Sequence, residues 1–286
     1  MLFENERPMC FDELVGRDKE IKQIKEMIAS PNGIPHLLFS GRQGTGKTTI
    51  ANIIANEVFG KEYKKSNYFE FNASSTRGIE FIRKDIAEIA KRRPMGVPYK
   101  IILMDEADNI TPDAQASLRR IMEIHAKNTR FIFTCNYPQK IIAPLISRFV
   151  SIPFAKVDTK SMGMYLKRIS KKHNLGFDDK KLIQFAKMAD GDLRLALNNL
   201  EGNIDSSVSE FIDNLTLDKI NKMSLDDKIN KLAFSLDPDY IFTKIWEIVK
   251  REKAWDLLLP LADCSFKMNN SLHKTLFLAN LLEKFF

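Results

Sequence analysis

The sequence is poor in the features that mark secreted and membrane proteins. Its three cysteines, Cys10, Cys135 and Cys264, are odd in number and far apart, which excludes both a disulfide framework and a closely spaced zinc-ligand set. No run of about 18 apolar residues is present to span a membrane. The segment Met1–Cys10 contains acidic residues and lacks the apolar core of a secretory signal. We therefore expect an intracellular protein (cytoplasmic or nuclear) that is not secreted and has no membrane partner.

The 286 residues suggest two or three compact units. A content of 44% hydrophobic and 28% charged residues argues against wholesale disorder.

The charge of the chain is uneven. The net charge is +7, and Lys61–Lys100 contains ten Lys and Arg against five Asp and Glu. From Asn203 to Phe286 the balance reverses to eleven against thirteen. The basic stretch suits contact with a polyanion, although a solvated surface would give the same excess.

Short β-type runs alternate with helical patterns over the first 150 residues. The β-type runs are His36–Ser40, Tyr68–Asn72, Lys100–Met104, Arg130–Cys135 and Val150–Ile152, and the helical patterns are Lys47–Phe59, Gly78–Lys91 and Pro112–His125. Strands that alternate with helices predict a parallel sheet covered on both faces.

From Thr159 onward the pattern is helical throughout. Three short helices are expected at Thr159–Lys172, Asp179–Met188 and Asp192–Asn199. Further helices follow Gly202, with breaks expected at Asp237-Pro238 and at Pro260. The polar segment Glu201–Val208 is the best candidate for a linker.

One segment fits the phosphate-loop pattern G-x-x-x-x-G-K-[ST] in full. Its residues are Gly41, Arg42, Gln43, Gly44, Thr45, Gly46, Lys47 and Thr48. It follows an apolar strand and opens a helical stretch, as such a loop must. The glycines let backbone N–H groups turn toward the phosphates of ATP, Lys47 would reach the β- and γ-phosphates, and Thr48 would ligate Mg²⁺.

Two carboxylates follow the apolar run Ile101–Met104. Asp105 and Glu106 would lie at the carboxyl end of a buried strand, where ligands bind in open α/β sheets. Asp105 would hold Mg²⁺, and Glu106 would act as the general base toward the attacking water. Together with the phosphate loop, they predict an ATPase site.

Several further motifs occur in order and at a family's spacing. They are Phe71-Asn72-Ala73-Ser74 followed by Thr76-Arg77-Gly78-Ile79, Thr111–Gln115 continuing to Leu118–Glu123, Cys135-Asn136-Tyr137, Ser147-Arg148, and Gly191–Arg194 with Ala196–Leu200. Through them the chain resembles the small subunits of replication factor C, the archaeal and eukaryotic clamp loader, from about Glu6 to Gly202.

The resemblance implies an α/β fold with three domains. These are an AAA+ parallel-sheet ATPase domain over residues 1–154, a small helical lid over 155–202, and an all-α collar over 203–286 that builds a five-subunit ring. The implied partners are other loader subunits, including a large one, the sliding clamp and primer–template DNA.

The resemblance also assigns roles to single residues. Asn136 resembles the sensor of the γ-phosphate, Arg194 a second sensor on the phosphates, and Arg148 an arginine finger that acts in trans on a neighbouring ATP site. The segment from Arg7-Pro8 through Val15-Gly16 resembles the adenine-side wall. Local alternatives exist: Asn136 could cap a turn, Arg148 could be a surface arginine, and Arg194 could pair within its helix.

The chain also departs from the family pattern. Phe149 follows Ser-Arg where the family usually has cysteine, and Arg42-Gln43 stands where two prolines are common. Asn5-Glu6 replaces a lysine–tyrosine pair, so an aromatic neighbour of the base is missing.

On the helix after Gly78, Arg83 and Lys84 are the best-placed candidates for DNA contact, by analogy with the family's duplex-tracking interior. The competing functions are another AAA+ DNA motor or initiator, such as a branch-migration helicase, and a structural ring subunit that binds nucleotide without hydrolysis. The slightly acidic C-terminal region shows no basic recognition helix, which disfavours the first. The intact set of ATPase residues disfavours the second.

Overall fold

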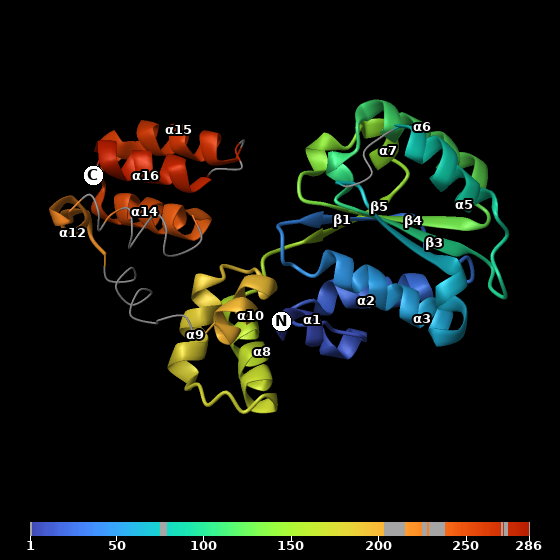
Figure 1. Cartoon of the computed structure of the whole chain (residues 1–286), viewed down its shortest axis with the longest axis horizontal. Helices are drawn as coiled ribbons and strands as arrows, with labels where there is room; N and C mark the ends of the chain where they lie inside the picture. Colours follow the sequence, from blue (N-terminus) through green and yellow to red (C-terminus); the bar gives the residue numbers. More distant parts are fainter. Residues whose placement is uncertain are drawn as a thin grey trace. The chain divides into compact units, whose positions relative to one another are not determined.

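The computed structural model describes residues 2–74, 79–202, 215–224, 228, 238–269, 271 and 274–285 (Figure 1). The chain forms two compact units, Met1–Tyr165 with Gly191–Leu195, and Leu166–Asp190 with Ala196–Phe286. The domain boundaries expected near 154 and 202 stay a prediction. The motif residues 76–78 and most of the expected linker at 201–208 lie outside the described residues.

The first unit is built on a five-stranded parallel sheet, which confirms the expected fold class. The strands are β1 (Leu37–Gly41), β2 (Tyr68–Asn72), β3 (Lys100–Asp105), β4 (Thr129–Cys135) and β5 (Val150–Phe154). Their order is β2-β3-β4-β1-β5, so β1 lies between β4 and β5 and pairs in parallel with both. Because these strands are parallel, the carboxyl ends of β1, β3 and β4 lie at the same edge of the sheet.

Helices cover both faces of the sheet because successive strand residues point to opposite sides. Leu37 and Phe39 of β1 belong to one buried cluster, whereas Leu38 between them belongs to the other. In Figure 1, α2 (Asp18–Ile28) and α3 (Lys47–Asn67) lie on one face. The segments α5 (Ala87–Lys91), α6 (Pro112–His125) and α7 (Ala143–Ile146) lie on the other.

Helix α3 is longer than the sequence pattern predicted. The expected end was Phe59, but helical structure resumes after Gly60 and continues to Asn67. Gly60 has φ 62° and ψ −174°, a non-helical geometry that glycine adopts with little cost and that kinks the helix. The buried Asn67 side chain donates to the carbonyl oxygen of Met95 at 2.9 Å and accepts from its N–H at 2.8 Å.

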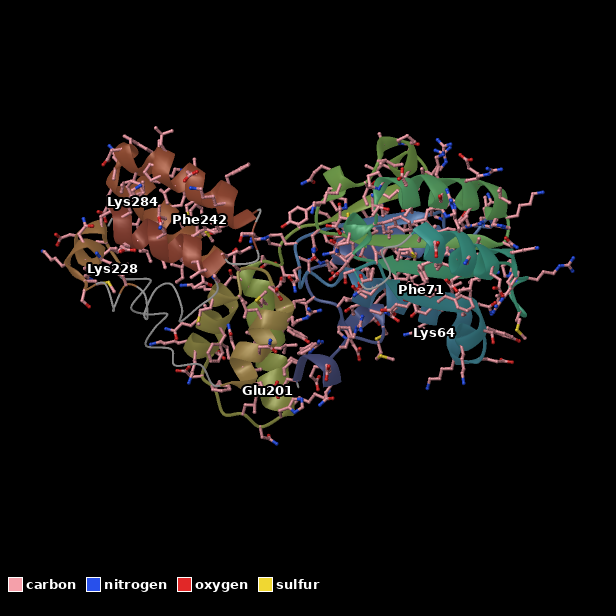
Figure 2. All side chains as sticks on the ribbon, turned by 45° about the horizontal axis from the view of Figure 1, so that its top comes forward. Lys64, Phe71, Glu201, Lys228, Phe242 and Lys284 are labelled. Atoms are coloured by element: carbon pink, nitrogen blue, oxygen red, sulfur yellow. The ribbon has the colours of Figure 1, made fainter. Side chains whose placement is uncertain are left out.

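The helical pattern expected over Gly78–Lys91 contains a π-helical turn. Helix α4 (Ile79–Phe81) passes into the π turn η2 (Ile82–Ile86), which continues into α5. Ile82 and Ile86 are fully buried in the core cluster on this face of the sheet. The ring of Phe71, labelled in Figure 2, packs edge-on against Phe81 with a centroid distance of 5.3 Å, which ties β2 to this segment.

The shorter elements of the first unit connect the strands and helices. They are α1 (Leu2–Asn5), η1 (Phe11–Glu13), η3 (Ala107–Asn109) and η4 (Pro138–Lys140). Two helices pass from one unit into the other, α8 (Thr159–Lys172) and α10 (Leu193–Glu201).

The second unit is helical in its described part. Besides the ends of α8 and α10 it contains α9 (Asp179–Met188), α12 (Leu217–Lys222), α14 (Pro238–Glu252), η6 (Trp255–Leu257), α15 (Leu258–Asn269) and α16 (Lys274–Phe285). The expected helix break at Pro260 is wrong, because Pro260 is the third residue of α15. Proline is tolerated in the first turn, where its missing N–H would have no helical partner.

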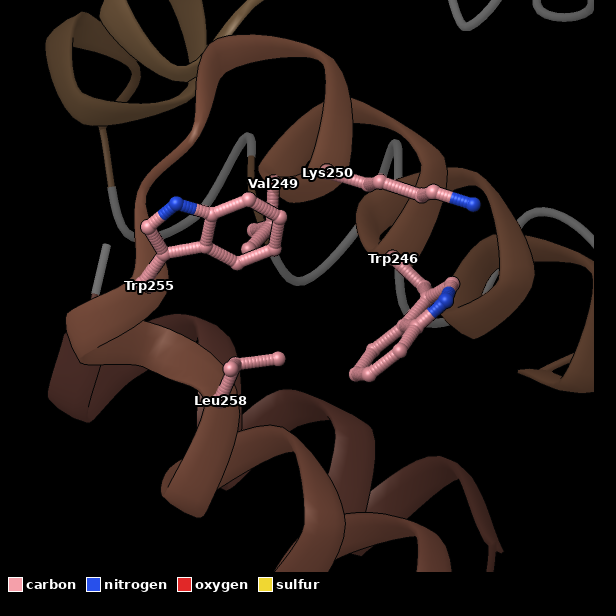
Figure 3. Close-up of a pocket in the computed structure, with 5 residues that line it drawn as sticks. All are labelled: Trp246, Val249, Lys250, Trp255 and Leu258. Carbon is pink, nitrogen blue, oxygen red and sulfur yellow. The ribbon is translucent and has the colours of Figure 1, made fainter.

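A small pocket opens among the C-terminal helices (Figure 3). It has a volume of 130 Å³ and is lined by Trp246, Val249 and Lys250 of α14, Trp255 of η6 and Leu258 of α15. No helix in the described ranges combines the length and apolar character needed to cross a membrane.

Candidate nucleotide site

The phosphate-loop sequence lies between β1 and α3, at the carboxyl edge of the sheet. Gly41, Gly44 and Gly46 have φ values of 153°, 70° and 93°, a region that favours glycine. A β-carbon at Gly41 would lie 2.3 Å from the carbonyl oxygen of Phe154, so a side chain there would displace the backbone of β5. The loop leads directly into α3, whose N-terminus presents unpaired backbone N–H groups.

Lys47 is buried and points back under this loop. Its Nζ donates to the carbonyl oxygens of Gly41 at 2.7 Å and Arg42 at 2.8 Å, and to Asn136 Oδ1 at 2.9 Å. Burial lowers the pKa of Lys47, and the nearby carboxylate of Asp105 opposes this shift. The structure therefore brings the lysine of the loop and the expected sensor Asn136 into direct contact.

The end of β3 contributes the acidic side of the site. Asp105 Oδ1 accepts hydrogen bonds from Thr48 Oγ1 at 2.8 Å and from the hydroxyl of Thr134 in β4. The next residue, Glu106, has the left-handed backbone conformation with φ 55°, and its N–H donates to Thr134 Oγ1 at 3.1 Å. Non-glycine residues adopt this conformation at a cost, and such residues cluster at functional sites.

Sequence reasoning missed Thr134, which joins Asp105 and Glu106. It is buried, at 1% exposure, within the apolar strand β4. The available signal was a hydroxyl residue directly after the apolar run Phe131–Phe133 of a buried strand, since buried hydroxyls need a partner.

Asp108 is a second missed residue. It lies three positions after Asp105 in the chain, and its side chain is buried. Its Oδ2 accepts from the backbone N–H groups of Asn136 at 3.3 Å and Tyr137 at 3.1 Å. The carboxylate thus fixes the backbone that carries Asn136 at the end of β4.

The expected second sensor, Arg194, lies at the start of α10 near the loop. The backbone N–H of Leu193 donates to the carbonyl oxygen of Gly44 at 3.1 Å. Asp192 caps the helix, with its Oδ1 accepting from the N–H of Arg194 at 2.8 Å. The guanidinium of Arg194 is exposed and lies over the ring of Phe3, 5.5 Å from its centroid. The segment before Arg194 therefore touches the phosphate loop, while the side chain contacts the N-terminal helix α1.

The other loop and wall residues are more open. Arg42 and Gln43 are exposed, and Val15 is half-buried. The exposed Arg7 reaches the first turn of α3, where its Nε donates to Thr49 Oγ1 at 3.4 Å.

Arg148 lies apart from these residues. Its guanidinium donates to the carboxylate of Glu123, to the carbonyl oxygen of Pro144 and, at 3.3 Å, to Ser147 Oγ. Among the described residues, none of its hydrogen bonds goes to the phosphate loop of its own chain. Arg83 and Lys84 are also separate: both are exposed on η2, and neither has an ion pair within the described ranges.

The residues at this edge of the sheet fit ATP with Mg²⁺. The glycine-lined turn, the N-terminus of the 21-residue helix α3 and the buried cation of Lys47 suit the phosphates. Mg²⁺ prefers oxygen ligands, and Thr48 Oγ1 and Asp105 Oδ1 lie 2.8 Å apart beside the loop. When bound, Mg²⁺ would neutralise charge on the phosphate oxygens.

Residues 37–156 match the model of the family described as "ATPase family associated with various cellular activities (AAA)". The chain is 39% identical over 241 residues to "Replication factor C small subunit 1" of Pyrobaculum islandicum, an alignment that covers 84% of this chain and 72% of that protein. It is 40% identical to "Replication factor C small subunit" of Archaeoglobus fulgidus, covering 80% of this chain and 71% of that one. For the protein of the same name from Picrophilus torridus the identity is 42%, covering 69% and 62%.

Solved structures with the same fold include the RuvB Holliday junction branch migration motor of Thermotoga maritima. The TM-score is 0.57 at 16% identity, covering 84% of this chain and 72% of that one. A structure of the same motor with an arginine replaced by alanine gives a TM-score of 0.59 at 18% identity, covering 84% and 85%. At such low identity these likenesses establish the fold alone.

Proposed function

Because the chain belongs to the replication factor C small-subunit family, we propose that it is a small subunit of a sliding-clamp loader. The chain is an ATPase of the AAA class. In this proposal ATP binding and hydrolysis drive the opening of the clamp and its placement on primed DNA. Loading clamps onto DNA would take place in the cytoplasm or nucleus. The observation that carries the proposal is the convergence of Lys47, Asp105 and Asn136 at one edge of the sheet in a chain of this family.

Each residue of the site has a separate role in ATP hydrolysis. Lys47 holds the β- and γ-phosphates, and Thr48 with Asp105 holds Mg²⁺. Glu106, next to Asp105 and anchored through Thr134, accepts a proton from the attacking water. Asn136 is positioned by Asp108 to orient that water and to detect the γ-phosphate.

Arg148 completes a different subunit's site in this proposal. Its hydrogen bonds within the described residues go to α6, α7 and Ser147 and not to its own phosphate loop, which supports a role at a neighbouring chain's site. An arginine supplied from a neighbour stabilises transition-state charge only when two subunits meet correctly. ATP turnover would thereby depend on ring assembly.

Exposed apolar side chains of the C-terminal helices support ring formation with other loader subunits, including a large subunit, in a five-membered assembly. Trp255, Leu259 and Leu276 are 54%, 82% and 60% exposed. The three residues lie on the consecutive elements η6, α15 and α16, and a contiguous apolar patch is typical of a surface that another protein covers.

DNA contact is proposed for Arg83 and Lys84. Ile82 and Ile86 anchor the π turn in the core, and the two basic side chains between them are exposed. Phosphate contacts of this kind position a duplex without reading its sequence.

The proposal is tested by ATPase rates of the chain assembled with its large-subunit partner. Primed DNA and the cognate clamp should each raise the rate, and both together should raise it most. Blunt duplex and unprimed single strand serve as matched DNA controls. A rate indifferent to the clamp would reject the loader, and specific stimulation by a four-way junction would instead indicate a branch-migration motor.

A further inference from the structure

Arg17 is a buried arginine that joins the phosphate loop to the last strand of the sheet. Its side chain is 3% exposed, and its Nη2 donates to the carbonyl oxygens of Thr45 at 3.0 Å and Ala155 at 2.7 Å. The guanidinium also lies 5.2 Å from the ring centroid of Phe154, the final residue of β5. Sequence reasoning did not single out Arg17, although it directly follows the segment expected to form the adenine-side wall.

The bond to Thr45 fixes the direction of one peptide group in the loop. In a trans peptide the C=O and the following N–H point in opposite directions. Because Arg17 binds the Thr45 carbonyl, the N–H of Gly46 in the same peptide group points away from Arg17. Gly46 has φ 93° and no side chain, and nothing lies within 4 Å of its β-carbon position, so no packing contact at that position holds this peptide. The Thr45 hydroxyl adds only a local bond, to Arg42 O at 2.7 Å.

The positive charge of Arg17 is incompletely compensated. Its ion-pair partner among the described residues is Glu20, with Nη1 to Oε1 at 3.4 Å. Its buried Nε has no hydrogen-bond partner in the described part of the chain. A buried cation of this kind favours a nearby anion, since the low-dielectric surroundings screen it poorly.

We propose that Arg17 is a positioning residue for phosphate binding, which holds the Thr45–Gly46 peptide so that the Gly46 N–H faces the nucleotide phosphates. The inference rests on the proposed nucleotide site and adds a residue from outside the phosphate-loop sequence. Through Ala155 the same guanidinium ties the loop to the backbone that leaves β5 toward α8.

The experiment measures displacement of a fluorescent ADP analogue from the full chain by ADP and by adenosine, with Mg²⁺ present. Arg17→Met removes the charge and the hydrogen bonds to Thr45 and Ala155, and Arg17→Lys keeps the charge but loses the forked geometry. Arg130→Met is the matched control. Its Nε also donates to a main-chain carbonyl, that of Ile34, at 2.7 Å. Arg130 is the second residue of β4, so it lies at the amino-terminal edge of the sheet, opposite the phosphate loop.

Arg17→Met should raise the Kd for ADP about tenfold to a hundredfold, as expected for a lost charge-assisted hydrogen bond to a binding group. Adenosine, which has no phosphate, should bind as it does to the parent. Arg17→Lys should fall between, and Arg130→Met should match the parent. Equal weakening of ADP and adenosine, or unchanged ADP affinity, would overturn the inference.

The unfolding midpoint without nucleotide shows whether each variant is folded. If Arg17→Met does not fold, Arg17→Lys and Arg17→Gln decide the question by the same ratio of ADP to adenosine affinity. A parent chain that binds no ADP would refute the proposed nucleotide site itself. If the parent and Arg17→Met bind ADP with equal affinity, only the role of Arg17 is refuted.

Discussion

Thr48 and Asp105 are 57 positions apart in the chain, yet Thr48 Oγ1 donates to Asp105 Oδ1 across 2.8 Å. Thr48 comes from the first turn of α3 and Asp105 from the last position of β3. The pair forms because α3 begins, and β3 ends, at the carboxyl edge of the same parallel sheet. Oxygen atoms from these two side chains therefore share one place beside the phosphate loop.

Asp105→Asn should weaken the dependence of nucleotide binding on Mg²⁺. The amide keeps an oxygen that can accept from Thr48, but the negative charge that attracts the cation is gone. We expect the apparent Mg²⁺ affinity to fall about tenfold or more, while ADP binding in EDTA stays close to that of the parent. Titration of Mg²⁺ at fixed nucleotide measures this. An unchanged Mg²⁺ midpoint would remove Asp105 from the cation site.

Glu106→Gln should separate ATP binding from turnover. The amide preserves the size of the side chain but cannot take a proton from water, and general-base contributions are typically about 10² to 10⁴ in rate. Single-turnover hydrolysis should fall by that order while the Kd for ATP stays unchanged. The backbone bond from Glu106 N–H to Thr134 does not involve the side chain, so the fold of the site should persist. Hydrolysis at the parental rate would assign the base to another residue.

Arg83→Ala with Lys84→Ala should weaken DNA binding equally across sequences. Each lost phosphate contact should reduce the slope of log affinity against log salt by roughly 0.9 on duplex DNA. The matched control is Lys19→Ala with Lys22→Ala, which removes the same charge from exposed positions on α2, across the sheet. If both double variants give the same salt slope, the π turn does not face DNA.

Stability should fall in mild acid because of His36. Its Nδ1 accepts from the backbone N–H of Phe131 at 3.0 Å, and burial, with a smaller effect of Arg130, lowers the pKa of His36 from 6.5 to about 4. The neutral form is the one that the fold accommodates, so its contribution is complete above pH 6.5 and is lost as pH falls toward 4.

Denaturant unfolding at pH 7.5 and pH 4.5 measures the effect, which should be about 2 kcal/mol for this residue. His36→Asn, which cannot take up a proton, should show a correspondingly smaller decrease. The same decrease in parent and variant would mean that other groups, such as carboxylates, account for it all.

Sequence pattern predicted most of the first unit because its signals are local. Alternation of strand and helix, the phosphate-loop pattern and the apolar run before Asp105 each depend on neighbouring residues, and the parallel sheet follows from them. The extension of α3 beyond Gly60 was missed because glycine is a common helix end, whereas here the chain kinks and continues. A helix break at Pro260 was predicted wrongly for a similar reason, because proline breaks a helix in its interior but not in its first turn.

The bonds that tune the site were less accessible to sequence reasoning. Three of these hydrogen bonds join residues 28 positions apart, and they involve Thr134, Asp108 and Arg17. The residues next to them in the sequence do not indicate which partner each will bind. The strand order, which places β4 beside β3, brings Thr134 and Asp108 to their partners, whereas Arg17 reaches Thr45 from the start of α2. The roles of Arg148 and Arg194 remain predictions from family resemblance.

In the isolated chain the guanidinium of Arg148 pairs with Glu123, and assembly should replace this contact. Both side chains are partly exposed, and ion pairs of this kind contribute only about 0.2–1 kcal/mol. The pair is therefore weak enough for the phosphates of ATP bound to a neighbouring subunit to replace Glu123. Arg148→Ala should leave the Kd for ATP of the isolated chain unchanged, but should lower hydrolysis by the assembled ring about 10³-fold or more. Arg119→Ala, which removes another arginine 3.9 Å from the Glu123 carboxylate, is the matched control.

The decisive measurement for Arg148 mixes Arg148→Ala chains with Lys47→Ala chains before assembly, with clamp and primed DNA present. Each variant alone should be inactive, because every interface then lacks either the lysine or the arginine. In mixed rings, an interface between an intact Lys47 of one variant and an intact Arg148 of the other should hydrolyse ATP. Activity should consequently peak near equal mixing, and a rate that stays at the baseline at every ratio would rule out action in trans.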